Sequence, residues 1–162
     1  MNRYLKGGVL ILLCALLPLS LTGCKLTKER VTETYNNVLQ AAGTALLTDD
    51  EVLKGERQFG ADEYTGTYSA AYENFDGTEC LFGGMSVERE SGNKVTVSLK
   101  AEAEAGEIQL LWVSGLEDPK VLFEDSGELR QTLELSEGCN YFCLSGENYS
   151  GCVALTLSDA PQ

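Results

Sequence analysis

The stretch V-T-V-S-L-K-A-E-A-E, residues 95–104, alternates apolar and polar side chains. One side of an extended chain would carry Val95, Val97, Leu99, Ala101 and Ala103, and the other Thr96, Ser98, Lys100, Glu102 and Glu104. Successive side chains of a β-strand point to opposite faces of the sheet. The pattern therefore predicts a strand with one face against a core and the other in water, as in antiparallel sheets.

Segments on both sides of this stretch extend the prediction. The expected strands cover residues 64–72, 78–90, 94–104, 107–114, 120–124, 128–136, 140–146 and 151–158. Turn signals such as Asp76-Gly77 and Ala105-Gly106 separate most of them. About eight short strands at this spacing predict a mainly β fold, an antiparallel, jelly-roll-like β-sandwich, over residues 61–162.

Residues 24–60 are expected to be helical before the first strand. From Thr27 to Leu47, apolar residues recur at spacings of three and four, at Val31, Tyr35, Val38, Leu39, Ala42 and Leu46. This spacing is typical of one face of an amphipathic helix. The following Thr48-Asp49-Asp50-Glu51 has the form of a capping box, which predicts a second, short helix to about Gln58.

The N-terminus has the order of a secretory signal. A basic segment with Arg3 and Lys6 precedes an apolar run that starts at Val9. The run holds about 13 residues before Thr22, whereas a membrane span needs about 20. An uncleaved anchor helix is therefore disfavoured, and an ordinary secretory signal is a further alternative.

The apolar run ends in Leu21-Thr22-Gly23-Cys24, which resembles the lipobox of bacterial prolipoproteins. The resemblance implies that residues 1–23 are a lipoprotein signal peptide, cleaved before Cys24, and that the Cys24 sulfur carries a diacylglycerol. Two acyl chains suffice for stable anchoring. The chain would then be held by lipid at the extracytoplasmic face of the cell membrane.

Taken whole, the chain resembles small uncharacterised lipoproteins of Gram-positive anaerobic bacteria. The order of lipobox, short helical segment and compact β domain carries this resemblance. The stretches G-A-D-E-Y-T-G-T-Y, residues 60–68, and G-C-N-Y-F-C-L-S-G-E-N-Y-S-G, residues 138–151, look like modules of such exported proteins. The resemblance implies an exported β-sandwich and no particular activity.

The charge of the chain disfavours some partners. Removing residues 1–23 takes away Arg3 and Lys6 and no acid, so the net charge of −13 for the full chain becomes −15. Such a field repels phosphate backbones, so no nucleic-acid partner is expected.

Four cysteines remain once Cys14, in the apolar run, and Cys24 are set aside: Cys80, Cys139, Cys143 and Cys152. A two-residue turn at Glu147-Asn148 would place Cys143 opposite Cys152, so we predict this bridge and a second between Cys80 and Cys139. Free buried thiols are the main alternative. The four lack the paired spacing of structural zinc sites, so no metal or cofactor is predicted.

The sequence offers little catalytic chemistry. It contains no histidine, which excludes Ser-His-Asp and Cys-His nucleophile pairs. It also lacks a nucleophile elbow and phosphate-binding loops. We therefore expect a non-enzymatic surface lipoprotein that binds a protein or glycan.

Two alternative functions are considered beside the non-enzymatic lipoprotein. The aromatic stripe Tyr64, Tyr68 and Tyr72, together with Trp112, could stack on sugars as a carbohydrate-binding module, although a core of tyrosines explains the same stripe. In L-L-W-V, residues 110–113, apolar neighbours on both parities predict a strand covered on both faces. A carboxylate-dependent hydrolase is the third hypothesis and needs two acids in a concave pocket.

Overall fold

The computed structural model describes residues 47–85, 87, 89–115 and 117–161, and all regular structure in this part of the chain is β. The strands are β1 Glu56–Phe59, β2 Gly66–Gly84, β3 Lys94–Ser114, β4 Lys120–Glu124, β5 Gly127–Glu134 and β6 Asn140–Asp159. Every strand pair is antiparallel. The predicted mainly β, antiparallel fold is thus confirmed.

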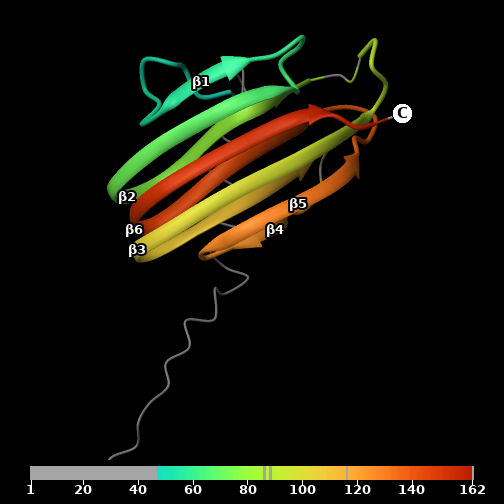
Figure 1. Ribbon diagram of the computed structural model, residues 1–162. Helices are drawn as coiled ribbons and strands as arrows, with labels where there is room; N and C mark the ends of the chain where they lie inside the picture. The colour runs from blue at the N-terminus through green and yellow to red at the C-terminus, as the bar shows by residue number, and fades with distance from the viewer. Residues whose placement is uncertain (1–46, 86, 88, 116, 162) are drawn as a thin grey trace, which may run out of the picture.

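The strands form one sheet in the order β1-β2-β6-β3-β4, with β5 also paired to β3 (Figure 1). The last strand, β6, lies between β2 and β3 along nearly its whole length. The first part of β3 pairs with β5, and its last part pairs with β4. The three long strands β2, β6 and β3 are therefore the frame, and the three short strands extend its edges.

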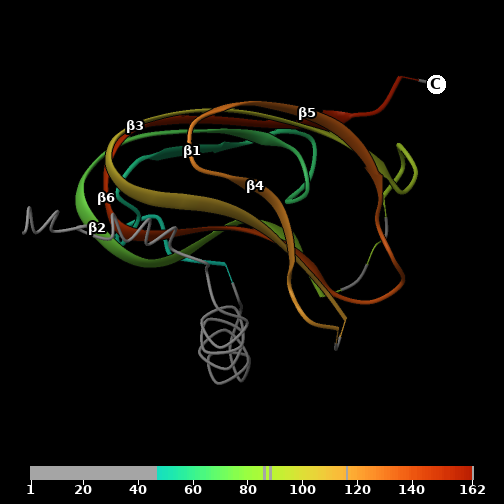
Figure 2. The same ribbon diagram turned by 90° about the horizontal axis from the view of Figure 1, so that it is seen from below.

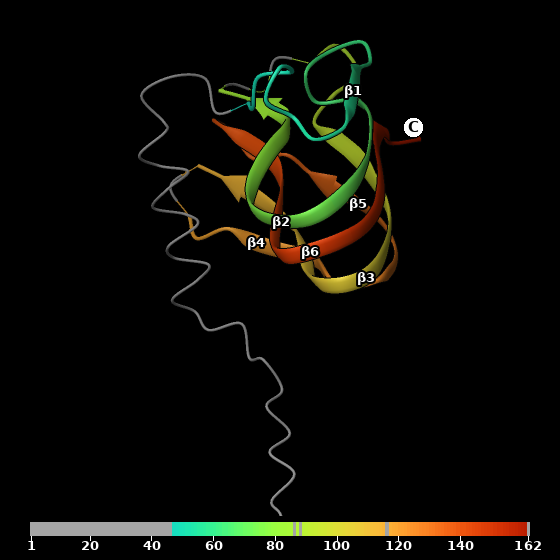
Figure 3. The ribbon, with the colours of Figure 1, turned by 90° about the vertical axis from the view of Figure 1, so that its left-hand side faces the viewer.

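The long strands bend over together, so that their two halves lie in two layers (Figure 2). Figure 3 looks onto the bend, where β2, β6 and β3 follow one another. Register shifts lie at this level in both pairings, around Phe75 in β2 and Ala105 in β3. Bulges of this kind sharpen the local bend and twist of a strand. We call residues before the bend in β2 and β3, and after it in β6, the first layer, and the other halves the second layer.

Three segments expected as turns are therefore bends inside continuous strands: Asp76-Gly77, Ala105-Gly106 and Glu147-Asn148. Gly106 has φ 70° and Asn148 has φ 47°, a left-handed backbone that suits bulges as well as turns. The chain stays paired on both sides of each segment. The eight predicted strands thus become five, and β1, in a segment that was expected to be helical, is the sixth.

The core lies between the two layers and follows the predicted alternation up to the bend. Val95, Val97, Leu99 and Ala101 are at most 3% exposed, whereas Ala103, expected on the same face, is exposed. Ala103 still pairs in register with Gly151, and the register shift follows it, so the change of side-chain parity affects only the residues after Ala103. Beyond the bend, the even-numbered residues of β3 enter the main core, including Ile108 and Leu110.

The short helix expected from Thr48 to about Gln58 is wrong. A single turn forms, in which the Val52 amide donates to the Asp49 carbonyl (2.9 Å). The Thr48 hydroxyl accepts from the Cys80 amide (2.9 Å) instead of capping a helix, and residues 56–59 pair with β2. Tertiary pairing has overridden a local signal.

The remaining N-terminal predictions concern residues 1–46, which lie outside the described residues. They include the signal peptide, the lipid site Cys24 and the helix from Thr27. Within the described part, no helix is long and apolar enough to cross a bilayer.

Candidate functional site

The row of exposed tyrosines that the carbohydrate-binding alternative requires is not formed, and the other interpretation, a core of tyrosines, is confirmed. Tyr64, Tyr68 and Tyr72 share a face of β2 and the preceding loop, but they are only 5%, 1% and 6% exposed. The second layer folds over this face, so the rings belong to the core. The three tyrosines cannot offer their faces to a sugar.

Trp112 is half-buried and packs against the same core. Its ring lies parallel to that of Phe142, with centroids 6.4 Å apart. The indole nitrogen donates to Asn140 Oδ1 (3.2 Å), and Lys120 Nζ lies 5.9 Å from the ring centroid. Leu111 and Val113, of opposite parity, are each 2% exposed, which confirms that this strand is covered on both faces.

The hydroxyl groups of Tyr68 and Tyr72 meet a buried carboxylate, Glu79. Each hydroxyl lies 2.7 Å from Glu79 Oε2, and the Lys54 amide donates to Oε1 (2.8 Å). Burial raises the pKa of both phenols, and the neighbouring carboxylate adds to the increase. Glu79 is 4% exposed and joins the two halves of β2 across the bend, so this cluster is structural.

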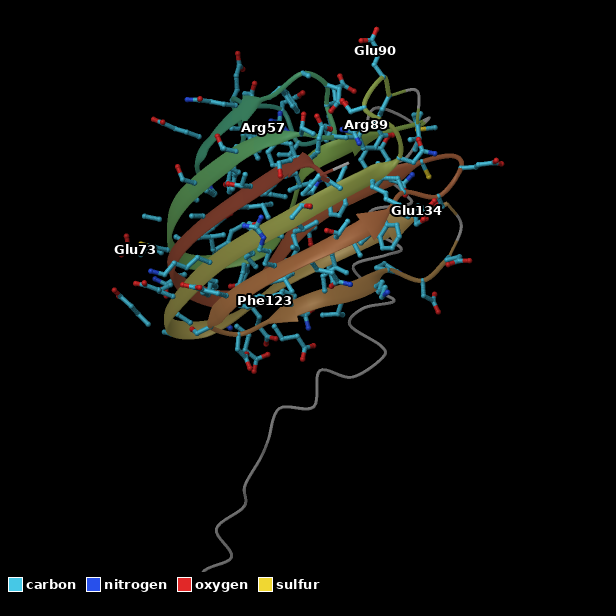
Figure 4. The ribbon with its side chains drawn as sticks, turned by 45° about the vertical axis from the view of Figure 1, so that its right-hand side comes forward. Arg57, Glu73, Arg89, Glu90, Phe123 and Glu134 are labelled. Atoms are coloured by element: carbon cyan, nitrogen blue, oxygen red, sulfur yellow. A yellow bond between two sulfur atoms is a disulfide. The ribbon has the colours of Figure 1, made fainter. Side chains whose placement is uncertain are left out.

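A second buried ionic group closes the end of the domain near β1. Arg89 is 1% exposed at its side chain and donates to Asp62 Oδ2 (2.7 Å) and Asp159 Oδ1 (2.5 Å). It thereby ties the β1–β2 loop, the β2–β3 loop and the end of β6. Figure 4 shows Arg89 and Arg57 on the same side of the domain, opposite Phe123.

The cysteine pairing differs from the prediction. Cys80 and Cys143 form the disulfide, while Cys139 is half-buried and free and Cys152 is exposed and free. A Cys143–Cys152 bridge fails because Glu147-Asn148 is a bulge, so that both cysteines lie along one continuous strand. The predicted Cys80–Cys139 bridge is excluded because Cys80 bonds to Cys143, its partner in the β2–β6 register.

A shallow groove on the outer face of the first layer is the strongest candidate binding site. It has a volume of about 530 Å³ and is lined by Ser98, Leu99, Lys100, Glu128, Leu129, Arg130, Ala154 and Thr156. Ser98 lies opposite Arg130 on β5 and Thr156 on β6, and Lys100 lies opposite Glu128 and Ala154. Small side chains along β6 leave room between the longer ones. A neighbouring hollow continues along Glu102, Ser126 and Gly127.

Two of the exposed bases of this acidic domain, Lys100 and Arg130, lie in the groove beside the acid Glu128. Residues 49–162 hold 23 acids against 7 bases, and two of the bases, Arg57 and Arg89, have side chains that are only 4% and 1% exposed. Lys100 and Arg130 are two of the exposed ones. Lys100 Nζ is 2.8 Å from Glu102 Oε1. The groove therefore offers ammonium, guanidinium, hydroxyl and carboxylate groups within a few residues of each other.

The ion pair also bears on acid catalysis. The hydrogen bond and charge of Lys100 lower the pKa of Glu102, and the same contact raises the pKa of Lys100. A glycosidase-type acid needs a carboxyl group that stays protonated, so its pKa must rise. Glu102 moves in the opposite direction. Among the described residues, no three His, Cys, Asp or Glu side chains gather as a potential metal site.

The sequence predicted that some residues of the groove would be exposed, but it did not predict that they would form a groove. Ser98 and Lys100 belong to the water-facing positions of residues 95–104, which the alternation predicted. That β5 and β6 flank them depends on long-range pairing, for which no local signal exists. The groove could therefore be identified only from the tertiary structure.

Comparisons with known proteins give few similarities. No model of a protein family matches the sequence, and no curated protein matches it significantly. Among solved structures, the chain is similar to one described as "CBM4 structure and function", with a TM-score of 0.30 and 14% identity over 60% of this chain and 81% of that chain. It is also similar to the C-terminal CBM6 of LamC from Zobellia galactanivorans, with a TM-score of 0.25 and 13% identity over 64% and 89%.

A third similar structure is Drosophila melanogaster CENP-C bound to CAL1, with a TM-score of 0.26 and 12% identity over 80% of this chain and 99% of that chain. Because all three TM-scores are low, these similarities assign neither a family nor a ligand. What the chain itself defines is an antiparallel β domain with a disulfide and a polar groove.

Proposed function

We propose that this protein is a lipid-anchored, extracytoplasmic binding domain that carries no catalytic activity and recognises a hydroxyl-rich ligand, such as an envelope glycan, in the groove of the first layer. The observation that carries the proposal is the groove itself. Ser98, Thr156 and Lys100 present hydrogen-bonding groups on one face, with small residues between them. Polar ligands need such convergent groups to replace the water that they lose.

The Cys80–Cys143 disulfide supports the proposed compartment. Disulfides persist in oxidising environments outside the cytoplasm and are rare inside it. The Leu21-Thr22-Gly23-Cys24 sequence supplies the corresponding export and anchoring signal. The anchor and the groove are separate parts of the proposal, and each has its own test.

Ligand binding is tested with the membrane-anchored full chain on an array of bacterial envelope glycans. We expect specific retention that a Lys100→Ala, Arg130→Ala double variant reduces by about 100-fold, since two charge-assisted hydrogen bonds would be lost. Lys120→Ala is the matched control, because Lys120 is an exposed cation beside Trp112, outside the groove residues. A wild-type protein that retains no glycan, or equal losses in both variants, would reject the groove as a glycan site.

The anchor is tested by fractionation and mass spectrometry. A Cys24→Ala variant should move from the membrane to the soluble fraction, and the wild-type chain should begin at a lipid-modified Cys24. An unmodified start at Met1, or equal membrane association of the variant, would reject lipid anchoring.

A further inference from the structure

The outer face of the second layer carries an apolar patch, which lies beside the polar residues Gln109 and Ser145. Residues that point away from the main core there are Cys80 on β2, Leu111 and Val113 on β3, and Tyr141 and Cys143 on β6. Each is at most 4% exposed, whereas their strand neighbours Leu110, Phe142 and Leu144 fill the main core. We refer to these five residues as the second-layer face.

Because the second-layer face points away from the main core and is nevertheless buried, a third layer must cover it. Lys100, on the outer face of the first layer, is 57% exposed at its side chain, as expected where a sheet face meets water. The second-layer face is instead built of residues that favour burial. Four of its members form a cluster of their own, against which Leu47 and Cys139 are the described, partly buried apolar side chains that pack.

The chain enters the described structure at this face. Leu47 packs on the cluster, and the next residue, Thr48, is bonded to its edge. The Thr48 amide donates to the Cys80 carbonyl (2.9 Å), and the Cys80 amide donates to the Thr48 hydroxyl (2.9 Å). Arg57 Nη2 donates to the Thr48 carbonyl (2.8 Å). Leu47 and Thr48 therefore hold the start of the described chain at the second-layer face.

We propose that residues 27–46 form a helix whose apolar face docks on the second-layer face and completes a three-layer domain. Val31, Tyr35, Val38, Leu39, Ala42 and Leu46 supply one apolar stripe, while Glu33 and Gln40 fall on the opposite side of such a helix. Twenty helical residues span about 30 Å, enough to cross the three central strands. An apolar stripe and an apolar sheet face each bury the surface that the other leaves in water.

Docking has a consequence for the orientation of the domain that rests on the proposed lipid anchor. Thr27 is three residues from Cys24, a reach of about 10 Å. The second-layer face would then stay near the membrane, and the groove, on the opposite outer face, would point away from it. The docking itself does not depend on the anchor or on a glycan.

The alkylation rates of the two free cysteines, Cys139 and Cys152, test the docking. Cys139 is half-buried beside the cluster, and Cys152 is exposed on the first layer. The full chain is alkylated, and the rate at each cysteine is measured by peptide mass spectrometry. Cys139 is the reporter of docking, and Cys152 is the internal reference. Leu39→Asp should raise the rate at Cys139 by about tenfold, since the helix would leave the face, and should leave Cys152 unchanged.

Gln40→Asp is the matched control, since the same charge then lies on the polar side of the helix, and it should leave both rates unchanged. Deleting residues 27–46 should raise the Cys139 rate at least as much as Leu39→Asp. Equal Cys139 rates in the wild type, Leu39→Asp and the deletion would overturn the proposal, as would equal increases for Leu39→Asp and Gln40→Asp. Failure of glycan binding or of lipid anchoring would leave these rates unaffected.

Discussion

Cys80 on β2 lies opposite Cys143 on β6, and a disulfide joins the two in the second layer. They are separated by 63 residues in the sequence, and the whole of β3, β4 and β5 lies between them. The bond therefore joins the first long strand of the frame to the last. It also fixes the edge to which Thr48 is bonded.

Removing this disulfide should lower the free energy of unfolding by about 2–4 kcal/mol, because the unfolded chain loses a long closed loop. The change is Cys80→Ala with Cys143→Ala, measured by urea unfolding. Cys152→Ser, at an exposed free thiol, is the control and should change stability by less than about 0.5 kcal/mol. Reductant should mimic the double variant in the wild type and have no effect on the double variant itself.

Glu79→Ala should lower the free energy of unfolding by roughly 3 kcal/mol, because two tyrosine hydroxyls and the Lys54 amide lose their shared acceptor. Glu79→Gln keeps one carbonyl oxygen in place and should cost less. The exposed Glu73→Gln serves as the control for the loss of one negative charge. Equal stabilities of Glu79→Ala and the wild type would show that the cluster contributes nothing.

Gly106→Ala should destabilise the domain more than Gly92→Ala, although both glycines have positive φ, 70° and 81°. A Cβ at Gly106 would lie 2.2 Å from the Asn148 carbonyl oxygen in the bend, whereas one at Gly92 would meet nothing within 4 Å. The backbone penalty alone is about 1–2 kcal/mol. We expect Gly106→Ala to cost about 2 kcal/mol more than Gly92→Ala in thermal or urea unfolding, owing to the added clash.

Stability should fall at alkaline pH. Burial, with smaller effects from neighbouring groups that include Glu63, raises the pKa of Tyr64 to about 12, and the pKa values of Tyr68, Tyr72, Tyr141 and Tyr149 are also raised. Unfolded tyrosines lose their proton near pH 10, so above that pH the unfolded state binds fewer protons than the folded one. The stability from Tyr64 is full below about pH 10 and is lost as the pH rises towards 12.

The measurement is the free energy of unfolding against pH, with tyrosinate absorbance recorded in parallel. Tyr64→Phe should reduce the slope above about pH 10 without removing it, because the other buried tyrosines titrate as well. A stability that stays flat through this range would contradict the burial of these phenols.

Local sequence patterns predicted burial correctly where the result did not depend on which distant segment packs beside the strand. Burial of Val95, Val97 and Leu99 followed from side-chain alternation, and so did the exposure of Lys100 and Glu102 on the other face. The double burial around Trp112 was also visible, because L-L-W-V is apolar on both parities. The core role of Tyr64, Tyr68 and Tyr72 was one of two interpretations that their spacing left open.

Other predictions failed because the same short sequence is compatible with two different local structures. Glycine and asparagine with positive φ occur in hairpin turns and in bulges, so Glu147-Asn148 could not show by itself that β6 continues. The pairing of Cys143 with Cys152 failed with that turn. Thr48-Asp49-Asp50-Glu51 likewise lost its helix to hydrogen bonds with Cys80, a residue 32 positions away.

The sequence by itself determined that the chain would build an antiparallel β domain and that Val95, Val97, Leu99 and Ala101 would be buried, because alternation is a property of the extended backbone. It did not predict that Thr96 would be buried or that Ala103 would be exposed. The proposed lipid anchor at Cys24 also rests on the sequence alone, on Leu21-Thr22-Gly23-Cys24. Only the tertiary structure decided that three strands bend into two layers, that Cys80 meets Cys143, and that β5 and β6 flank Ser98 and Lys100. These are pairings between distant segments, and their energy depends on register and packing across the whole sheet rather than on any local run of residues.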